Sequence, residues 1–189
     1  MAGQDKKPGS RDLIQRLKEM WGLLQREWAE KWDRTLPFAD YLVDRWEKAA
    51  ILGFGKGSTV YDSSLVIGDV RVGENTWVGP FTILDGSGGL EIGSSCTISA
   101  GVQIYSHDNI KKTVTGGVEP IEHSSTRIGD RCYIGPNTTI VKGVTIGDGC
   151  IIGANSLVLE DIASGSIAHG TPCRVVDSTE KFLGFQEKH

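Results

Sequence analysis

A histidine near the middle of the chain is the first candidate for chemistry. His107 lies in the run Tyr105-Ser106-His107-Asp108-Asn109, where a patterned stretch of sequence ends and an irregular one begins. Because an imidazole titrates near neutral pH, it can take up a proton and return it within one reaction cycle. His107 is therefore a candidate general base, and an ordinary loop histidine is the alternative.

A six-residue period on either side of His107 predicts the element that must hold it. Aliphatic residues recur at every sixth position, the next residue is often glycine, and the fifth position is usually small. This period is typical of a parallel β-helix, in which three hexapeptides form one triangular coil. It slips by two residues near Gly88-Gly89. The aliphatic positions are Val60, Val66, Val72, Val78, Leu84, Ile92, Ile98, Ile104, Ile128, Ile134, Ile140, Ile146, Ile152 and Val158.

An unpatterned segment interrupts the repeats after Ile104. It keeps the frame, because the next aliphatic position, Ile128, falls four repeats later. We therefore expect residues 106–127, approximately, to form a loop extruded from one coil. Ile128 should then stack on Ile92, and Ile146 on Ile128. The same register places three cysteines in one inward column, where we expect small buried apolar side chains rather than redox or metal chemistry: Cys96, Cys132 and Cys150.

The chain before the repeats has a helical pattern from residue 10 to about 52. One apolar stripe consists of Leu13, Leu17, Met20, Leu24, Trp28 and Trp32. A second helical segment is expected to begin at Pro37 and to stop at Gly53. These helices should dock on the main domain or on a neighbouring subunit; a membrane-surface helix is the alternative, which the acidic residues on the polar face disfavour.

The expected fold class is all-β: a left-handed parallel β-helix with an extruded loop and an N-terminal helical extension. We divide the chain into an extension (1–52), the β-helix domain (53–176) and a C-terminal tail (177–189). The net charge of −4 argues against binding nucleic acid. The polar first ten residues do not resemble a secretory signal. A cytoplasmic protein with reduced cysteines is therefore expected, and the absence of C-x-x-C pairs argues against structural zinc.

Four segments carry a resemblance to a known family: ILDGSGGLEIG, GVQIYSHDN, IGPNTTIVKGVTIGDGCIIGANSLVLEDI and GTPCRVV. From about residue 58 to 176 the chain resembles the hexapeptide-repeat acetyltransferases, the superfamily of galactoside, maltose and surface-polysaccharide O-acetyltransferases. The resemblance implies a homotrimer with active sites between subunits. It also implies transfer of an acetyl group from acetyl-CoA to a hydroxyl or amine of a sugar, free, nucleotide-linked or part of a surface polysaccharide.

The resemblance also implies roles for particular residues near the loop. His107 stands at the loop entry, where the family has its general base, and Asp85 matches a motif aspartate that supports the imidazole or the acceptor. A turn residue beside Gly86 is the other interpretation of Asp85. Asp108, Asn109 and His123 are candidate acceptor-binding residues, although several relatives have a second histidine in place of Asn109.

Coenzyme A is expected on the later coils. Tyr133 occupies a position where relatives often have tryptophan, and Gly135 and Ala154 match small positions near the pantetheine arm. Arg174 in GTPCR matches a basic residue near the CoA phosphates, for which a guanidinium is well suited. Glu160 stands where relatives commonly have a lysine, so one phosphate contact is missing.

Three lysines are further candidates for binding anions. Lys111 and Lys112 could attract the phosphate of a nucleotide sugar, and Lys142 could replace the contact missing at Glu160. For each of them, a solvated surface charge is the alternative.

Two other functions remain open from the sequence. A zinc hydratase of the carbonic anhydrase kind would need three histidines at a subunit interface. Apart from His189, the chain has only His107, His123 and His169, without the paired spacing of such a site, so no metal is expected. A non-catalytic β-helix scaffold would need neither His107 nor a coenzyme A site.

Overall fold

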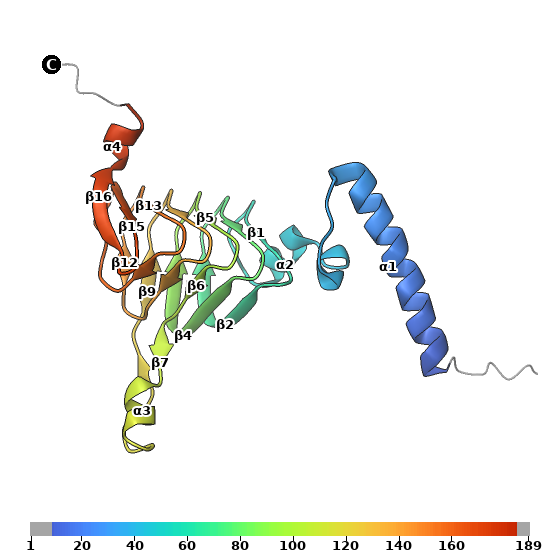
Figure 1. Ribbon diagram of the computed structural model, residues 1–189, viewed down its shortest axis with the longest axis horizontal. Coiled ribbons are helices and arrows are strands. Elements are labelled where there is room, and N and C mark those ends of the chain that lie inside the picture. Colours follow the sequence, from blue (N-terminus) through green and yellow to red (C-terminus); the bar gives the residue numbers. More distant parts are fainter. Residues whose placement is uncertain (1–8, 185–189) are drawn as a thin grey trace, which may run out of the picture. The chain divides into compact units, whose positions relative to one another are not determined.

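The computed structural model describes residues 9–184, so residues 1–8 and 185–189, including His189, lie outside the described part (Figure 1). The contacts divide the chain into two compact units, residues 1–44 and residues 45–189. Among the described residues, no helix is both long enough and apolar enough to cross a membrane.

The first unit contains the expected amphipathic helix, α1 (Ser10–Trp32), and a short 3-10 helix, η1 (Phe38–Tyr41). Two edge-to-face aromatic pairs join them, each with ring centroids 5.9 Å apart: Trp21 with Phe38, and Trp28 with Tyr41. No residue of α1 is buried, so its apolar stripe remains largely exposed in the single chain.

The second helical segment differs from the prediction. Pro37 does open it, but as the N-cap of η1, and α2 (Arg45–Ile51) is a separate helix. The prediction of one segment from Pro37 is wrong because the chain closes tight turns here, with the N–H of Leu42 donating to the carbonyl of Ala39. Gly53 does follow the end of α2, with a positive φ of 73°.

Helix α2 belongs to the second unit and lies against the first strand of the β-helix. Ala49 and Phe54 are part of the buried core, and Lys48 forms a 2.9 Å ion pair with Asp62. A coil buries its apolar face only against neighbouring coils, so the terminal coil needs such a cover.

The coils consist of short strands that pair in parallel with strands of neighbouring coils. One sheet has the order β1-β3-β5-β10-β13-β15-β16, and the other has the order β12-β9-β4-β6-β11-β14, with β2 paired to β4. The strands are β1 (Thr59–Val60), β2 (Leu65–Val72), β3 (Trp77–Val78), β4 (Ile83–Ile92), β5 (Thr97–Ile98), β6 (Gln103–Ile104), β9 (Thr126–Ile128), β10 (Tyr133–Ile134), β11 (Thr139–Ile140), β12 (Thr145–Ile146), β13 (Ile151–Ile152), β14 (Leu157–Val158), β15 (Ser166–His169) and β16 (Arg174–Ser178).

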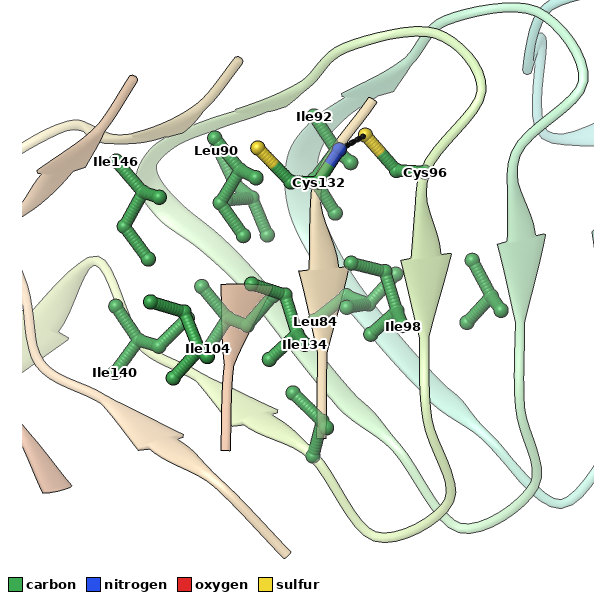
Figure 2. Close-up of a cluster of buried hydrophobic side chains, with 14 of the residues drawn as sticks. Leu84, Leu90, Ile92, Cys96, Ile98, Ile104, Cys132, Ile134, Ile140 and Ile146 are labelled. Atoms are coloured by element: carbon green, nitrogen blue, oxygen red, sulfur yellow. Dashed lines mark hydrogen bonds between the residues drawn. The ribbon is translucent and has the colours of Figure 1, made fainter. Parts of the chain in front are cut away.

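The predicted stacking of the aliphatic positions is confirmed. Ile92 pairs with Ile128, and Ile128 with Ile146, in the register expected from the repeat. All three side chains are buried, and Figure 2 shows the inward-pointing residues as one continuous core. At the C-terminal end, β16 pairs antiparallel with β15, and α4 (Thr179–Phe182) follows it.

The slip in the period is a bulge in β4. Gly68 of β2 pairs with Gly86, but the next pair is Val70 with Leu90, so β4 has two more residues than β2 between these pairs. A Cβ at Gly86 would lie 2.2 Å from the carbonyl oxygen of Asp69, so only glycine fits this close approach. The bulge directly follows Asp85.

The cysteine column is confirmed, but its chemistry is more polar than expected. Each buried thiol lies 3.1 Å from a backbone carbonyl oxygen of the next coil: Cys96 with Gly129, Cys132 with Gly147, and Cys150 with Ala163. The N–H of Cys132 also donates to the sulfur of Cys96 (Figure 2). The fifth position is small because its side chain must fit the corner and satisfy a buried carbonyl.

Replacing Cys132 with leucine should destabilise the β-helix. The larger side chain must enter a closed column between Cys96 and Cys150 and leaves the carbonyl of Gly147 without its donor. Overpacking of this kind typically costs about 1–3 kcal/mol. Thermal unfolding measures the effect, and Cys132→Ser, which keeps a small donor, is the control. A leucine variant as stable as the wild type would contradict this description of the column.

The extruded loop is present and contains structure of its own. It begins with β7 (His107–Asp108), continues through a short helix, α3 (Ile110–Val114), and returns through β8 (Glu122–His123). β7 and β8 pair antiparallel, so the base of the loop is a small hairpin that projects from the coils (Figure 1).

Candidate active site

His107 and Asp85 are in direct contact. Asp85 lies in β4 and is only 1% exposed, whereas the side chain of His107 in β7 is 35% exposed. The Nδ1 atom of His107 is 2.5 Å from the Oδ2 atom of Asp85, a short hydrogen bond. The two residues come from neighbouring coils. Asp85 lies in β4, which pairs with β6, and β6 leads into the loop that begins with His107.

The surroundings of Asp85 keep its carboxylate ionised. Burial raises the pKa of Asp85, but hydrogen bonds from the hydroxyl and N–H of Ser87, the N–H of Ser106 and His107 outweigh this, and the pKa falls to about 2. An ionised carboxylate can only accept hydrogen bonds, so the proton of the shared bond belongs to Nδ1 of His107. The Nε2 atom then carries the free lone pair of the imidazole.

The β4 bulge explains why a carboxylate is tolerated at this buried position. The N–H of Ser87 reaches back to the Asp85 carboxylate two residues earlier, as in an Asx turn. The N–H of Gly88 donates to the hydroxyl of Ser106, which ties the bulge to the loop entry. Sequence reasoning missed Ser87 and Ser106, although the Asp-Gly-Ser turn signal was visible.

A pocket of about 340 Å³ opens beside His107. It combines aliphatic walls with polar groups, and its lining consists of Tyr105, His107, Asp108, Asn109, Ile110, Val141 and Lys142. His123 pairs with His107 across the hairpin, and their rings stack with centroids 5.9 Å apart. The structure therefore brings together all five residues predicted at the loop: His107, Asp85, Asp108, Asn109 and His123.

The residues predicted to bind coenzyme A do not line this pocket. Tyr133 lies in β10 and is 43% exposed, and Arg174 lies in β16. Both strands belong to the sheet that does not contain β4, the strand of Asp85. Gly135 and Ala154 lie on neighbouring coils, where a Cβ at residue 135 would be 2.5 Å from the nitrogen of Ala154. Coil spacing alone thus accounts for glycine at this position.

Two of the three candidate lysines have carboxylate partners. Lys142 forms ion pairs with Asp108 and Glu122, both at 3.1 Å, and Lys111 lies 2.6 Å from the other oxygen of Glu122. Sequence reasoning did not identify Glu122. Lys112 and Glu160 are exposed. Within residues 9–184, no group of three or more His, Cys, Asp and Glu side chains is arranged to hold a metal ion.

Two family models match the repeats. One is described as bacterial transferase hexapeptide (six repeats) and matches residues 125–160; the other, the hexapeptide repeat of succinyl-transferase, matches residues 69–106. No curated protein sequence matches the chain.

Solved structures share the fold over most of the chain. A maltose O-acetyltransferase from Clostridium difficile 630 is 30% identical, with a TM-score of 0.56 and 88% of each chain covered. Galactoside acetyltransferase in complex with coenzyme A is 20% identical, with a TM-score of 0.63, covering 94% of this chain and 88% of that one. AntD, an N-acyltransferase from Bacillus cereus in complex with dTDP and 3-hydroxybutyryl-CoA, is 20% identical, with a TM-score of 0.58, covering 76% and 95%.

The 30% identity to the maltose O-acetyltransferase, over most of both chains, shows that this chain belongs to the hexapeptide-repeat acetyltransferases. The two relatives at 20% identity support the fold alone.

Proposed function

We propose that the protein transfers an acetyl group from acetyl-CoA to a hydroxyl or amine of a sugar-containing acceptor, with His107 as the general base. The observation that carries this proposal is the contact between His107 Nδ1 and the ionised Asp85, which leaves Nε2 able to accept a proton beside a pocket. The 30% identical maltose O-acetyltransferase supports the choice of acetyl-CoA as the donor.

The proposed reaction follows from this proton arrangement. His107 Nε2 takes the proton from the acceptor hydroxyl while the oxygen attacks the carbonyl carbon of the thioester. Asp85 stabilises the imidazolium that forms. When the tetrahedral intermediate collapses, the C–S bond breaks and His107 returns the proton to the departing thiolate of CoA. A general base of this kind typically contributes ~10²–10⁴ in rate.

The acceptor side of the proposal uses the pocket beside His107. Asn109 and His123 offer hydrogen-bonding groups to sugar hydroxyls, while Ile110 and Val141 provide apolar surface for a sugar ring. Asp108 lines the same pocket. A free sugar, a nucleotide sugar and a surface polysaccharide precursor are the acceptor classes to compare, and cytoplasmic polysaccharide biosynthesis is the proposed setting.

The donor side is proposed to need a second subunit. Tyr133, Gly135, Ala154 and Arg174 retain their proposed roles in binding coenzyme A, although they lie away from the His107 pocket of the same chain. A homotrimer, with each active site formed between neighbours, would allow these residues of one subunit to serve the histidine of the next.

The experiment that tests the proposed function is a screen of acceptors with acetyl-CoA. Release of the free CoA thiol is followed for maltose, galactosides, amino sugars and nucleotide sugars, and products are identified by mass spectrometry. Thiol release that depends on a sugar, with a product 42 Da heavier than the acceptor, roughly the mass of one acetyl group replacing a proton, supports the proposal. No acceptor-dependent release with any of these classes, despite bound acetyl-CoA, would contradict it.

Replacing Arg174 with alanine should weaken the binding of coenzyme A. The guanidinium is the cation proposed to meet the CoA phosphates, and a charge-assisted contact of this kind contributes about 1.5–3 kcal/mol, or roughly a 10- to 150-fold change in Kd. Calorimetric titration with CoA measures the change, with turnover at saturating donor affected less. An unchanged Kd would reject the role of Arg174.

A further inference from the structure

Lys142 holds an unusual place beside the proposed base. It follows β11 by two residues, and its ammonium nitrogen is 3.1 Å from both Oδ2 of Asp108 and Oε2 of Glu122. Its side chain is 21% exposed and also lines the pocket of His107. One cation on the rigid coil thus contacts both strands of the hairpin at the base of the loop.

The hairpin needs a cation at this point. Asp108 of β7 and Glu122 of β8 are direct cross-strand partners, and like charges in this relation destabilise a strand pair. The N–H of Ile110 and the Lys142 ammonium lower the pKa of Asp108, and ion pairs with Lys111 and Lys142 lower that of Glu122. Both carboxylates are therefore ionised at neutral pH, and Lys142 is the group that contacts both.

The position of His107 depends on this hairpin. Asp108 follows His107 directly in β7, and each strand has only two residues, so backbone pairing alone gives the hairpin little stability. Any shift of β7 would move the imidazole away from the fixed carboxylate of Asp85 in β4. Displacements of about 1 Å in an active site can lower rates by up to ~10²-fold.

We propose that Lys142 is a positioning residue that fastens the β7–β8 hairpin to the coil and thereby holds His107 against Asp85. This inference rests on the proposed role of His107 as the base. It replaces the expectation that Lys142 contacts a CoA phosphate, because the ammonium already faces two carboxylates. Lys111 is likewise engaged with Glu122, which leaves neither lysine an uncompensated charge for an acceptor phosphate.

The test compares Lys142→Met, Lys142→Arg and the control Lys112→Met, which replaces a lysine of the extruded loop outside these ion pairs. The first readout is amide hydrogen exchange in residues 106–124, which needs no enzyme activity. Lys142→Met should raise exchange in the hairpin by tenfold or more, while Lys142→Arg and Lys112→Met stay close to the wild type. Unchanged exchange in Lys142→Met would overturn the proposal.

The second readout separates positioning from ligand binding. Lys142→Met should lower kcat by about tenfold, on the scale expected for a displaced catalytic group, with the Kd for acetyl-CoA within twofold of the wild-type value and activity rescued by arginine. A weakened Kd for acetyl-CoA with normal exchange would instead identify a phosphate contact and overturn the proposal.

Failure of the base and failure of the positioning role give different results. If His107→Ala kept full activity, the proposed base would be wrong, whereas rapid hairpin exchange in Lys142→Met would still show the fastening. If His107→Ala were inactive but Lys142→Met showed normal exchange, the result would support His107 as the base and reject the positioning role of Lys142.

Discussion

Replacing His107 with alanine should lower turnover by two or more orders of magnitude while leaving the fold intact. In the His107–Asp85 pair, the Nε2 atom of the imidazole is the atom proposed to take the proton from the acceptor. General-base contributions are typically ~10²–10⁴-fold. The side chain is 35% exposed and outside the buried core, and Asp85 keeps its hydrogen bonds from Ser87 and Ser106, so the variant should remain folded. The initial rate at saturating acetyl-CoA and acceptor measures the effect.

His169→Ala is the matched control for this experiment. It makes the same replacement at an exposed histidine of β15, away from the loop. The Kd for acetyl-CoA should remain at the wild-type value in both variants, because neither histidine is assigned to the donor. A His107→Ala variant with the wild-type rate would remove this residue from the chemistry.

Replacing Asp85 with asparagine should have the second largest effect on turnover. The variant keeps the size of the side chain but loses the negative charge that fixes the proton on Nδ1 of His107 and stabilises the imidazolium. In the wild type, Ser87 and Ser106 donate hydrogen bonds to the ionised carboxylate of Asp85. In the variant, one of these acceptor oxygens becomes an amide NH₂ group, which cannot accept them. We expect kcat to fall by ~10²–10⁴-fold, the range of the base it supports, with a smaller change in KM.

The control for Asp85→Asn is Asp69→Asn in the neighbouring strand. The side chain of Asp69 is 63% exposed and pairs with Arg71, so the same chemical change is made without touching His107. Thermal unfolding of both variants separates a loss of stability from a loss of catalysis. If Asp85→Asn turned over at the wild-type rate, Asp85 would be a turn residue of the bulge without a role in the reaction.

The coils could be predicted from the sequence because the same packing contact repeats in every hexapeptide. One aliphatic residue must point inward in each hexapeptide, so positions such as Ile92, Ile128 and Ile146 reveal both the fold and the register. The loop could be located for the same reason, as the place where the period stops without losing its frame.

The details of the site were harder to predict because they depend on contacts without a period. Asp108, Glu122 and Lys142 meet only after the loop has folded back onto the coil, and no spacing in the sequence signals this. The slip near Gly88-Gly89 was visible, but not its consequence, a bulge whose N–H groups serve Asp85 and the loop entry. The N-terminal pattern failed at η1 because short turns there replace the continuous helix that apolar spacing suggested.

The most direct test of the central claim is a calorimetric titration of the purified protein with acetyl-CoA. An acetyltransferase with a donor site formed by each chain and its neighbour should bind acetyl-CoA with micromolar affinity and a stoichiometry of one per chain. Absence of binding under these conditions would contradict the account and favour a β-helix that serves as a scaffold.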